Sequence, residues 1–129
     1  MQIQEYINGF QHIALPTRNM QKTKEFYASL GFKIAWEKEN CPTYFQLKDI
    51  VIESWEDQNA ATGAGAWLHL SIDVSDIQAV HTYLTQNGYC VSVGKESPKC
   101  DRFLTEKGVA CVMIEGPNGE TIEFNQIFR

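Results

Sequence analysis

Apolar and polar residues alternate along residues 66–73, and this pattern predicts a β-strand. Leu68, Leu70 and Ile72 share one face of the extended chain, which we expect to pack against a core. His69 points to the opposite face. The strand therefore offers one histidine on the side away from its aliphatic residues.

The same pattern occurs earlier in the chain, at residues 10–16, where His12 lies beside the aliphatic residues Ile13 and Leu15. Each of the two strands is followed by a polar turn and by a segment in which apolar residues recur at helical spacing. These segments predict helices over 20–30 and 77–87. We interpret the sequence as two copies of one unit, each opening with a histidine-bearing strand.

Further short strands complete each copy. In the first copy they are expected at 32–37, 43–47 and 50–56, with a tight turn at residues 48–49. In the second they are expected at 89–93, 109–115 and 120–126, with a turn at residues 116–119 and a long polar loop at 94–107.

The order of elements in each copy is thus β-α-β-β-β, which predicts an α+β fold whose two sheets, facing each other in one chain or across a dimer, would enclose a cleft. We expect one domain over residues 1–129. Its first module covers about 9–56, a small and glycine-rich linker covers about 57–65, and its second module covers about 66–127.

Four residues lie on strand faces opposite the aliphatic one, and each belongs to an opening or closing strand of its copy. They are His12, Glu53, His69 and Glu123. A lone histidine or glutamate at such a position is more often an ordinary polar residue, but the placement occurs in both copies. Two imidazoles and two carboxylates suit a divalent ion such as Zn, Ni, Co, Fe or Mn and leave positions open for substrate.

Composition narrows the other possibilities. The formal net charge of −5 argues against nucleic-acid binding, no apolar run is long enough to span a bilayer, and the first residues lack a signal peptide, so a cytoplasmic protein is expected. The four cysteines have no CxxC spacing, and we predict that none is needed for metal or activity. They are Cys41, Cys90, Cys100 and Cys111.

Several segments of the chain resemble the vicinal oxygen chelate superfamily, which includes glyoxalase I, methylmalonyl-CoA epimerase, extradiol dioxygenases and bleomycin-binding proteins. The resemblance covers nearly the whole chain, from Phe10 to Gln126, and its motifs are FQHIAL from Phe10, FYASLGF from Phe26, Ile52-Glu53, HLSIDV from His69 and GPNGETIEF from Gly116. It implies an α+β fold in which two βαβββ modules form a cupped mixed sheet around a metal site, a small-molecule substrate and a homodimer.

The family's metal positions correspond to His12, Glu53, His69 and Glu123 here, and this four-ligand set is closest to glyoxalase-I-like members. The resemblance implies a lyase or isomerase that, like lactoylglutathione lyase, passes through an enediolate, with Glu123 as the base and Glu53 as its counterpart. Pro16 and Asp57 stand where glyoxalase I enzymes carry an arginine and an asparagine that hold glutathione.

Two other classes of function remain open from the sequence. One is a binding protein that sequesters a small molecule without turnover, and the other is a metal-dependent oxygenase. Residues expected to line the cup are Phe10, Trp55, Trp67 and Asn125. The polar loop at 94–107 either closes over an acidic substrate through its basic side chains, Lys95, Lys99, Arg102 and Lys107, or is an ordinary solvated segment.

Overall fold

The computed structural model describes residues 2–115 and 121–129, so the turn expected at 116–119 lies outside the described residues. The chain divides into two compact units. One is His12–Leu68, here called the α1 unit, and the other is Met1–Gln11 with His69–Arg129, here called the α2 unit. No helix in the described part of the chain is long and apolar enough to cross a membrane.

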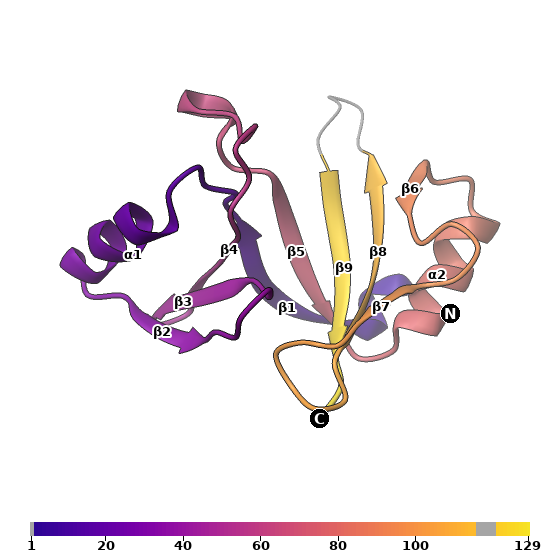
Figure 1. Ribbon diagram of the computed structural model, residues 1–129. Coiled ribbons are helices and arrows are strands. Elements are labelled where there is room, and N and C mark those ends of the chain that lie inside the picture. The colour runs from indigo at the N-terminus through magenta and orange to yellow at the C-terminus, as the bar shows by residue number, and fades with distance from the viewer. Residues whose placement is uncertain (1, 116–120) are drawn as a thin grey trace. The chain divides into compact units, whose positions relative to one another are not determined.

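The α1 unit has strands in the order β2-β3-β4-β1, with β1 and β4 parallel and the other neighbours antiparallel (Figure 1). Its elements are the end of β1 (Ile7–Ala14), α1 (Met20–Ser29), β2 (Lys33–Trp36), β3 (Thr43–Leu47), β4 (Ile50–Ser54) and the short 3₁₀ turn η2 (Gly63–Gly65). Asn19 caps α1 by accepting a hydrogen bond from the Lys22 amide at 3.0 Å. Gly31, at φ +101°, ends the helical turn.

Strand register decides which face of this sheet α1 covers. Ile52 is paired with Ile13 on one side and with Phe45 on the other, so these three side chains share one face. Tyr27 of α1 contacts Phe45, with ring centroids 5.9 Å apart. The helix therefore packs on the aliphatic face of the sheet.

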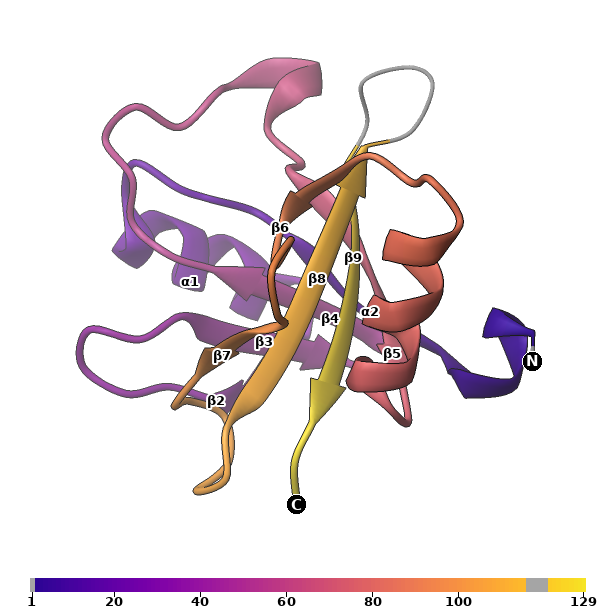
Figure 2. The ribbon, with the colours of Figure 1, turned by 90° about the vertical axis from the view of Figure 1, so that its right-hand side faces the viewer.

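The α2 unit has strands in the order β5-β9-β8-β6, with β5 and β9 parallel and β7 also paired with β8. Its elements are η1 (Ile3–Tyr6), the start of β1, β5 (His69–Val74), α2 (Ile77–Gln86), β6 (Val91–Val93), β7 (Lys99–Asp101), β8 (Val109–Glu115) and β9 (Thr121–Ile127). Helix α2 lies along β8 and β9 (Figure 2). Its residues Ile77, Val80 and Leu84 form a core with Val112 and Phe124.

The α+β class and the two βαβββ modules are confirmed. The long loop expected at 94–107 is a partial error, because it contains β7, whose residues Lys99 and Asp101 pair with Cys111 and Val109. A three-residue polar strand has no hydrophobic alternation to reveal it, since backbone hydrogen bonding alone attaches it to β8.

The aliphatic face of the second histidine strand is confirmed only in part. Ile72 packs against the α2 core, but Leu70 is 42% exposed and Leu68 is 51% exposed. Leu68 lies before β5, and Leu70 lies near the start of β5, where it pairs with Ile122. The β5 residue that is buried in the core is Val74, at the end of the strand. The alternation identified the face correctly but not how far the helix covers it.

Candidate functional site

His12 and Glu53 form a buried pair in the α1 unit. Their strands are parallel neighbours, and the pairing of Ala14 with Glu53 puts His12 and Glu53 on the face opposite α1. His12 Nε2 lies 3.4 Å from Glu53 Oε1, and His12 is completely buried. The sequence predicted that both residues lie on the face opposite the aliphatic one.

Tyr44 holds the Glu53 carboxylate, a role that the sequence pattern did not reveal. It stands directly opposite Glu53 on the neighbouring strand, and its hydroxyl donates to Glu53 Oε2 at 2.5 Å. Its ring meets the His12 imidazole edge-on, with centroids 5.8 Å apart and planes at 88°. The two-residue turn at 48–49 fixes the register of β3 against β4. Pairing the residues on either side of that turn, one after another, leads from Leu47 and Ile50 to Tyr44 and Glu53, so the sequence did contain a signal for this contact.

His69 and Glu123 form the equivalent pair in the α2 unit. Strands β5 and β9 are parallel, with Ser71 paired to Glu123, and His69 Nε2 lies 3.7 Å from Glu123 Oε1. Both side chains are buried. Each unit therefore buries one imidazole and one carboxylate on its polar face, as the repeated sequence pattern predicts.

Polar neighbours surround Glu123. Asn125 Nδ2 donates to Glu123 Oε1 at 3.2 Å, and the side chain of Gln11 donates to the Asn125 carbonyl at 2.9 Å. Within the described part of the chain, Ser71 Oγ and Asn125 Oδ1 are buried without a hydrogen-bond partner. A buried hydroxyl and amide oxygen in that state favour a polar guest, since leaving them unsatisfied costs free energy.

Cys111 also belongs to this polar face, beside Asn125 on β8. Burial raises the pKa of its thiol to about 12, and the nearby Glu123 carboxylate acts on that pKa in the same direction. Cys111 is therefore a neutral thiol near neutral pH. From the sequence we predicted that Cys111 is not needed for metal binding or activity. Its position near Glu123 depends on how β8 pairs with β9, which the sequence pattern did not reveal.

The donor atoms in each unit are of the kinds that bind a divalent metal ion. His12, His69 and Glu123 are buried and each offers one ligand atom. Two ligands that each lie about 2.1 Å from one ion, at a tetrahedral angle, are about 3.4 Å apart. The spacing inside the two pairs, 3.4 Å and 3.7 Å, is compatible with coordination of an ion, and nitrogen with carboxylate oxygen suits Zn, Ni, Co, Fe or Mn.

The residues expected to line the cup differ in their surroundings. Asn125 is buried on the polar face, Trp55 is half-buried, and Phe10 and Trp67 are exposed. In the basic segment, Lys99 Nζ lies 3.6 Å from Asp101 Oδ2, so part of its charge is offset locally.

Paired βαβββ units, each with a histidine and a glutamate buried opposite its helix, define a protein of the vicinal oxygen chelate class. The comparison with protein families agrees: residues 9–124 match the Glyoxalase/Bleomycin resistance protein/Dioxygenase superfamily, and the chain belongs to it. The family resemblance predicted from the sequence is confirmed. A search of curated proteins found no match.

Solved structures share this fold at low sequence identity. Methylmalonyl-CoA epimerase from Mycobacterium tuberculosis is 16% identical with a TM-score of 0.77, over 100% of this chain and 94% of that one. A hypothetical protein from Bacillus halodurans C-125 is 16% identical with a TM-score of 0.71, over 93% and 94%. A homoprotocatechuate 2,3-dioxygenase variant from B. fuscum is 17% identical with a TM-score of 0.61, over 92% of this chain but 32% of that one.

Replacing Tyr44 by phenylalanine tests whether its hydroxyl stabilises buried Glu53. We expect Tyr44→Phe to lower the free energy of unfolding by about 1–3 kcal/mol, because a buried carboxylate oxygen loses its donor. Urea denaturation followed by circular dichroism measures the loss. Tyr27→Phe is the matched control in the same unit. Equal stability of the two variants would mean that the Tyr44 hydroxyl contributes nothing.

The raised pKa of Cys111 makes a second prediction. At pH 8, a thiol with a pKa of about 12 has a roughly thousandfold smaller thiolate fraction than one at the ordinary 9.0. Iodoacetamide should therefore modify the exposed Cys90 and Cys100 well before Cys111, as read by peptide mass spectrometry. Denatured protein, in which all cysteines should react alike, is the control.

The same shift sets a pH dependence of stability. Because the pKa of Cys111 is raised in the folded state, the contribution of its neutral thiol to stability is fully present below about pH 9 and is lost as pH rises toward 12. Cys111→Ala should lessen this alkaline loss, as measured by urea denaturation across the same pH range. An identical loss in both proteins would show that Cys111 does not cause it.

Proposed function

We propose that the protein is a metal-dependent enzyme of glyoxalase-I type, a lyase or isomerase acting on a small substrate with two vicinal oxygens. His12, Glu53, His69 and Glu123 are its proposed metal ligands, as in the family resemblance. The observation that supports this most directly is the repeated pair, one buried imidazole beside one buried carboxylate in each unit. We also propose that residues 1–129 act as one domain with 57–65 as the linker.

The two glutamates are held differently, which supports separate roles. Glu53 accepts a short hydrogen bond from Tyr44, and this contact fixes its carboxylate in place. Glu123 accepts a longer hydrogen bond from a neutral amide, that of Asn125. We therefore assign Glu123 as the base and Glu53 as a fixed carboxylate.

In the proposed reaction, a divalent ion supplies Lewis-acid stabilisation of the negative charge that develops on the substrate oxygens. Glu123 takes a proton from the carbon next to the carbonyl and returns it to the neighbouring carbon, so no atoms are gained or lost. Ser71 Oγ offers a hydroxyl donor and Asn125 Oδ1 an acceptor to the polar part of the substrate. Cys111 remains protonated beside Glu123 and does not compete as a base.

An oxygenase of the same superfamily is the second candidate, and Tyr44 is the observation that favours it. If Tyr44 keeps Glu53 away from the metal, two histidines and Glu123 remain, which is the ligand set of non-haem iron oxygenases. Substrate-dependent oxygen uptake by iron-loaded protein distinguishes this reaction from isomerisation. Stoichiometric ligand binding with neither metal nor turnover would instead identify a binding protein.

We further propose a homodimer in the cytoplasm. Leu30, which follows α1, and Ile34 of β2 are exposed apolar residues. A second copy of the chain is the natural cover for these two residues.

Removing one proposed ligand tests the metal site. We expect His69→Ala to lose stoichiometric metal, because the remaining donors no longer enclose the ion. Elemental analysis of protein purified without chelators measures the metal content. His81→Gln is the control, since His81 lies on α2 and its ring contacts the Lys95 carbonyl. Full metal content in His69→Ala would refute this assignment.

The substrate prediction concerns glutathione. We expect poor lactoylglutathione lyase activity, because Pro16 offers no donor for a carboxylate and Asp57 repels one. Losing one charged contact costs about 1.5–3 kcal/mol, roughly ten- to a hundredfold in affinity. Steady-state assays with methylglyoxal and glutathione on nickel-, cobalt- and zinc-loaded protein provide the measurement. A kcat/KM above about 10⁵ M⁻¹s⁻¹ would show that the two departures do not matter.

A further inference from the structure

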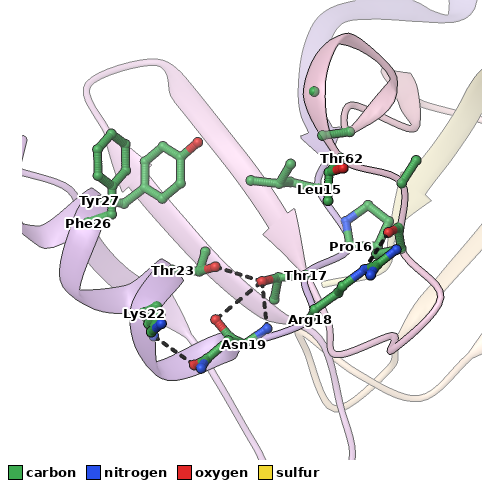
Figure 3. A pocket seen from close by; sticks show the side chains of 14 residues that line it. Leu15, Pro16, Thr17, Arg18, Asn19, Lys22, Thr23, Phe26, Tyr27 and Thr62 are labelled. Carbon is green, nitrogen blue, oxygen red and sulfur yellow. Dashed lines mark hydrogen bonds between the residues drawn. The ribbon is translucent and has the colours of Figure 1, made fainter.

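A cavity of about 420 Å³ lies in the α1 unit, and none of the proposed metal ligands is among the residues that line it. Its walls come from three segments of that unit: the connection from β1 to α1, the first two turns of α1, and residues 60–66. Figure 3 shows Phe26 and Tyr27 on one side and Leu15 and Thr62 on the other. Its volume falls within the range of about 300–1,000 Å³ that is usual for small-molecule sites.

Strand alternation separates this cavity from the polar face of the sheet. Leu15 directly follows β1, and its amide continues the hydrogen bonding to β4 by donating to the Glu53 carbonyl at 2.8 Å, so its side chain points to the face opposite His12. Glu53 shares the face of His12, whereas Tyr27 packs on the opposite face through Phe45. The helix-side residues Leu15 and Tyr27 therefore line the cavity, and neither His12 nor Glu53 is among its lining residues.

The inner wall of the cavity is apolar. It contains Leu15, Pro16, Phe26, Tyr27, Ala60 and Ala66. Phe26 stands on the apolar side of an amphipathic helix, yet 58% of it is exposed. Its ring makes an edge-on contact with the Tyr27 ring, with centroids 5.1 Å apart and planes at 88°. An apolar body inside the cavity would remove this ring from water, which is favourable.

The rim of the cavity is positively charged in a protein whose formal net charge is −5. Arg18 and Lys22 line it, and none of the fourteen described residues around it is acidic. Arg18 Nε donates to the Ala60 carbonyl at 2.8 Å, which fixes the guanidinium and directs recognition to its two terminal nitrogens. Such a fork matches the geometry of a carboxylate.

The framework beneath these charges is already ordered. Thr17 Oγ1 and Thr23 Oγ1 lie 2.8 Å apart and join the loop to the helix (Figure 3). Asn19 caps the Lys22 amide, and the Gln58 side chain donates to the Arg18 carbonyl at 3.1 Å. A ligand would therefore meet a preformed site, and little ordering would oppose its binding.

From these observations we propose that the α1-unit cavity is a second small-molecule site that binds an organic carboxylate with an apolar body. The carboxylate binds Arg18 and Lys22, and the apolar body packs against Phe26 and Leu15. The site has no acidic group to receive a cation among the described residues that line it. None of the four proposed metal ligands lines it.

The test uses 4-phenylbutyrate as the probe and neutral 4-phenylbutanamide as its matched control, titrated into ¹⁵N-labelled full-length protein. We expect saturable amide shifts confined to residues 15–27 and 60–66, with a Kd of about 1 mM or lower for the carboxylate and at least tenfold weaker binding of the amide. Equal binding of both probes, or shifts elsewhere, would overturn the proposal.

Variants make the test specific. Arg18→Gln and Lys22→Gln should each weaken the carboxylate at least about tenfold and leave the weak binding of the amide unchanged. Phe26→Ala should weaken both probes. Lys48→Gln, a change of the same charge in a turn of the same unit, should alter neither. Unaltered carboxylate affinity in Arg18→Gln would refute the proposed role of the rim.

Two further measurements distinguish this cavity from the metal site and from a surface that a second copy covers. His69→Ala should bind the carboxylate as tightly as the unmodified protein, since the cavity does not use that residue; a loss of binding there would show that the two sites are not separate. Light scattering tests whether a second copy occupies the cavity. If Phe26→Asp changes a dimer to a monomer and the unmodified dimer shows no saturable binding, a partner chain covers this surface and the proposal is wrong.

Discussion

A buried carboxylate is stable only when nearby groups replace the water it has lost, and this requirement shapes both units. Glu53 has the Tyr44 hydroxyl and the His12 imidazole beside it, and Glu123 has Asn125 and His69. All of these neighbours come from strands, where register sets their separation. The sheet is therefore the means by which two acidic groups can be kept inside a protein of modest size.

Packing of the helices on the apolar faces of the sheets offsets the free-energy cost of burying these polar groups. The two units differ in how much of the helix is buried. Helix α2 fully buries Ile77, Val80 and Leu84 in a continuous core, whereas α1 fully buries none of its residues. The same pattern in the sequence has thus produced one closed core and one that leaves space beside the helix. The cavity next to Phe26 is a consequence of this difference, and its place on the helix side leaves the polar face unaffected.

Much of this arrangement was predictable because alternation along a strand is a local property. It placed His12, Glu53, His69 and Glu123 on polar faces, and it gave the bounds of β3 and β8 as they are observed. The neighbours of the glutamates depend on which residue of another strand lies opposite, and a pattern within one strand does not contain that information. Tyr44 and Cys111 were missed for this reason. Strand β7 was missed because backbone pairing to a neighbour, not hydrophobicity, forms it.

Tyr44 also connects the fold to the choice between the two proposed reactions. A carboxylate has two oxygens, and in Glu53 they have different neighbours, since Oε2 accepts from Tyr44 and Oε1 faces His12. Glu53 can therefore keep its hydrogen bond and still offer Oε1 to an ion held by His12. In the proposed isomerase Glu53 would complete the four-ligand set, whereas the oxygenase candidate would need Tyr44 to hold Glu53 away from the metal. The hydrogen bonding of this one carboxylate is therefore the structural difference between the two proposals.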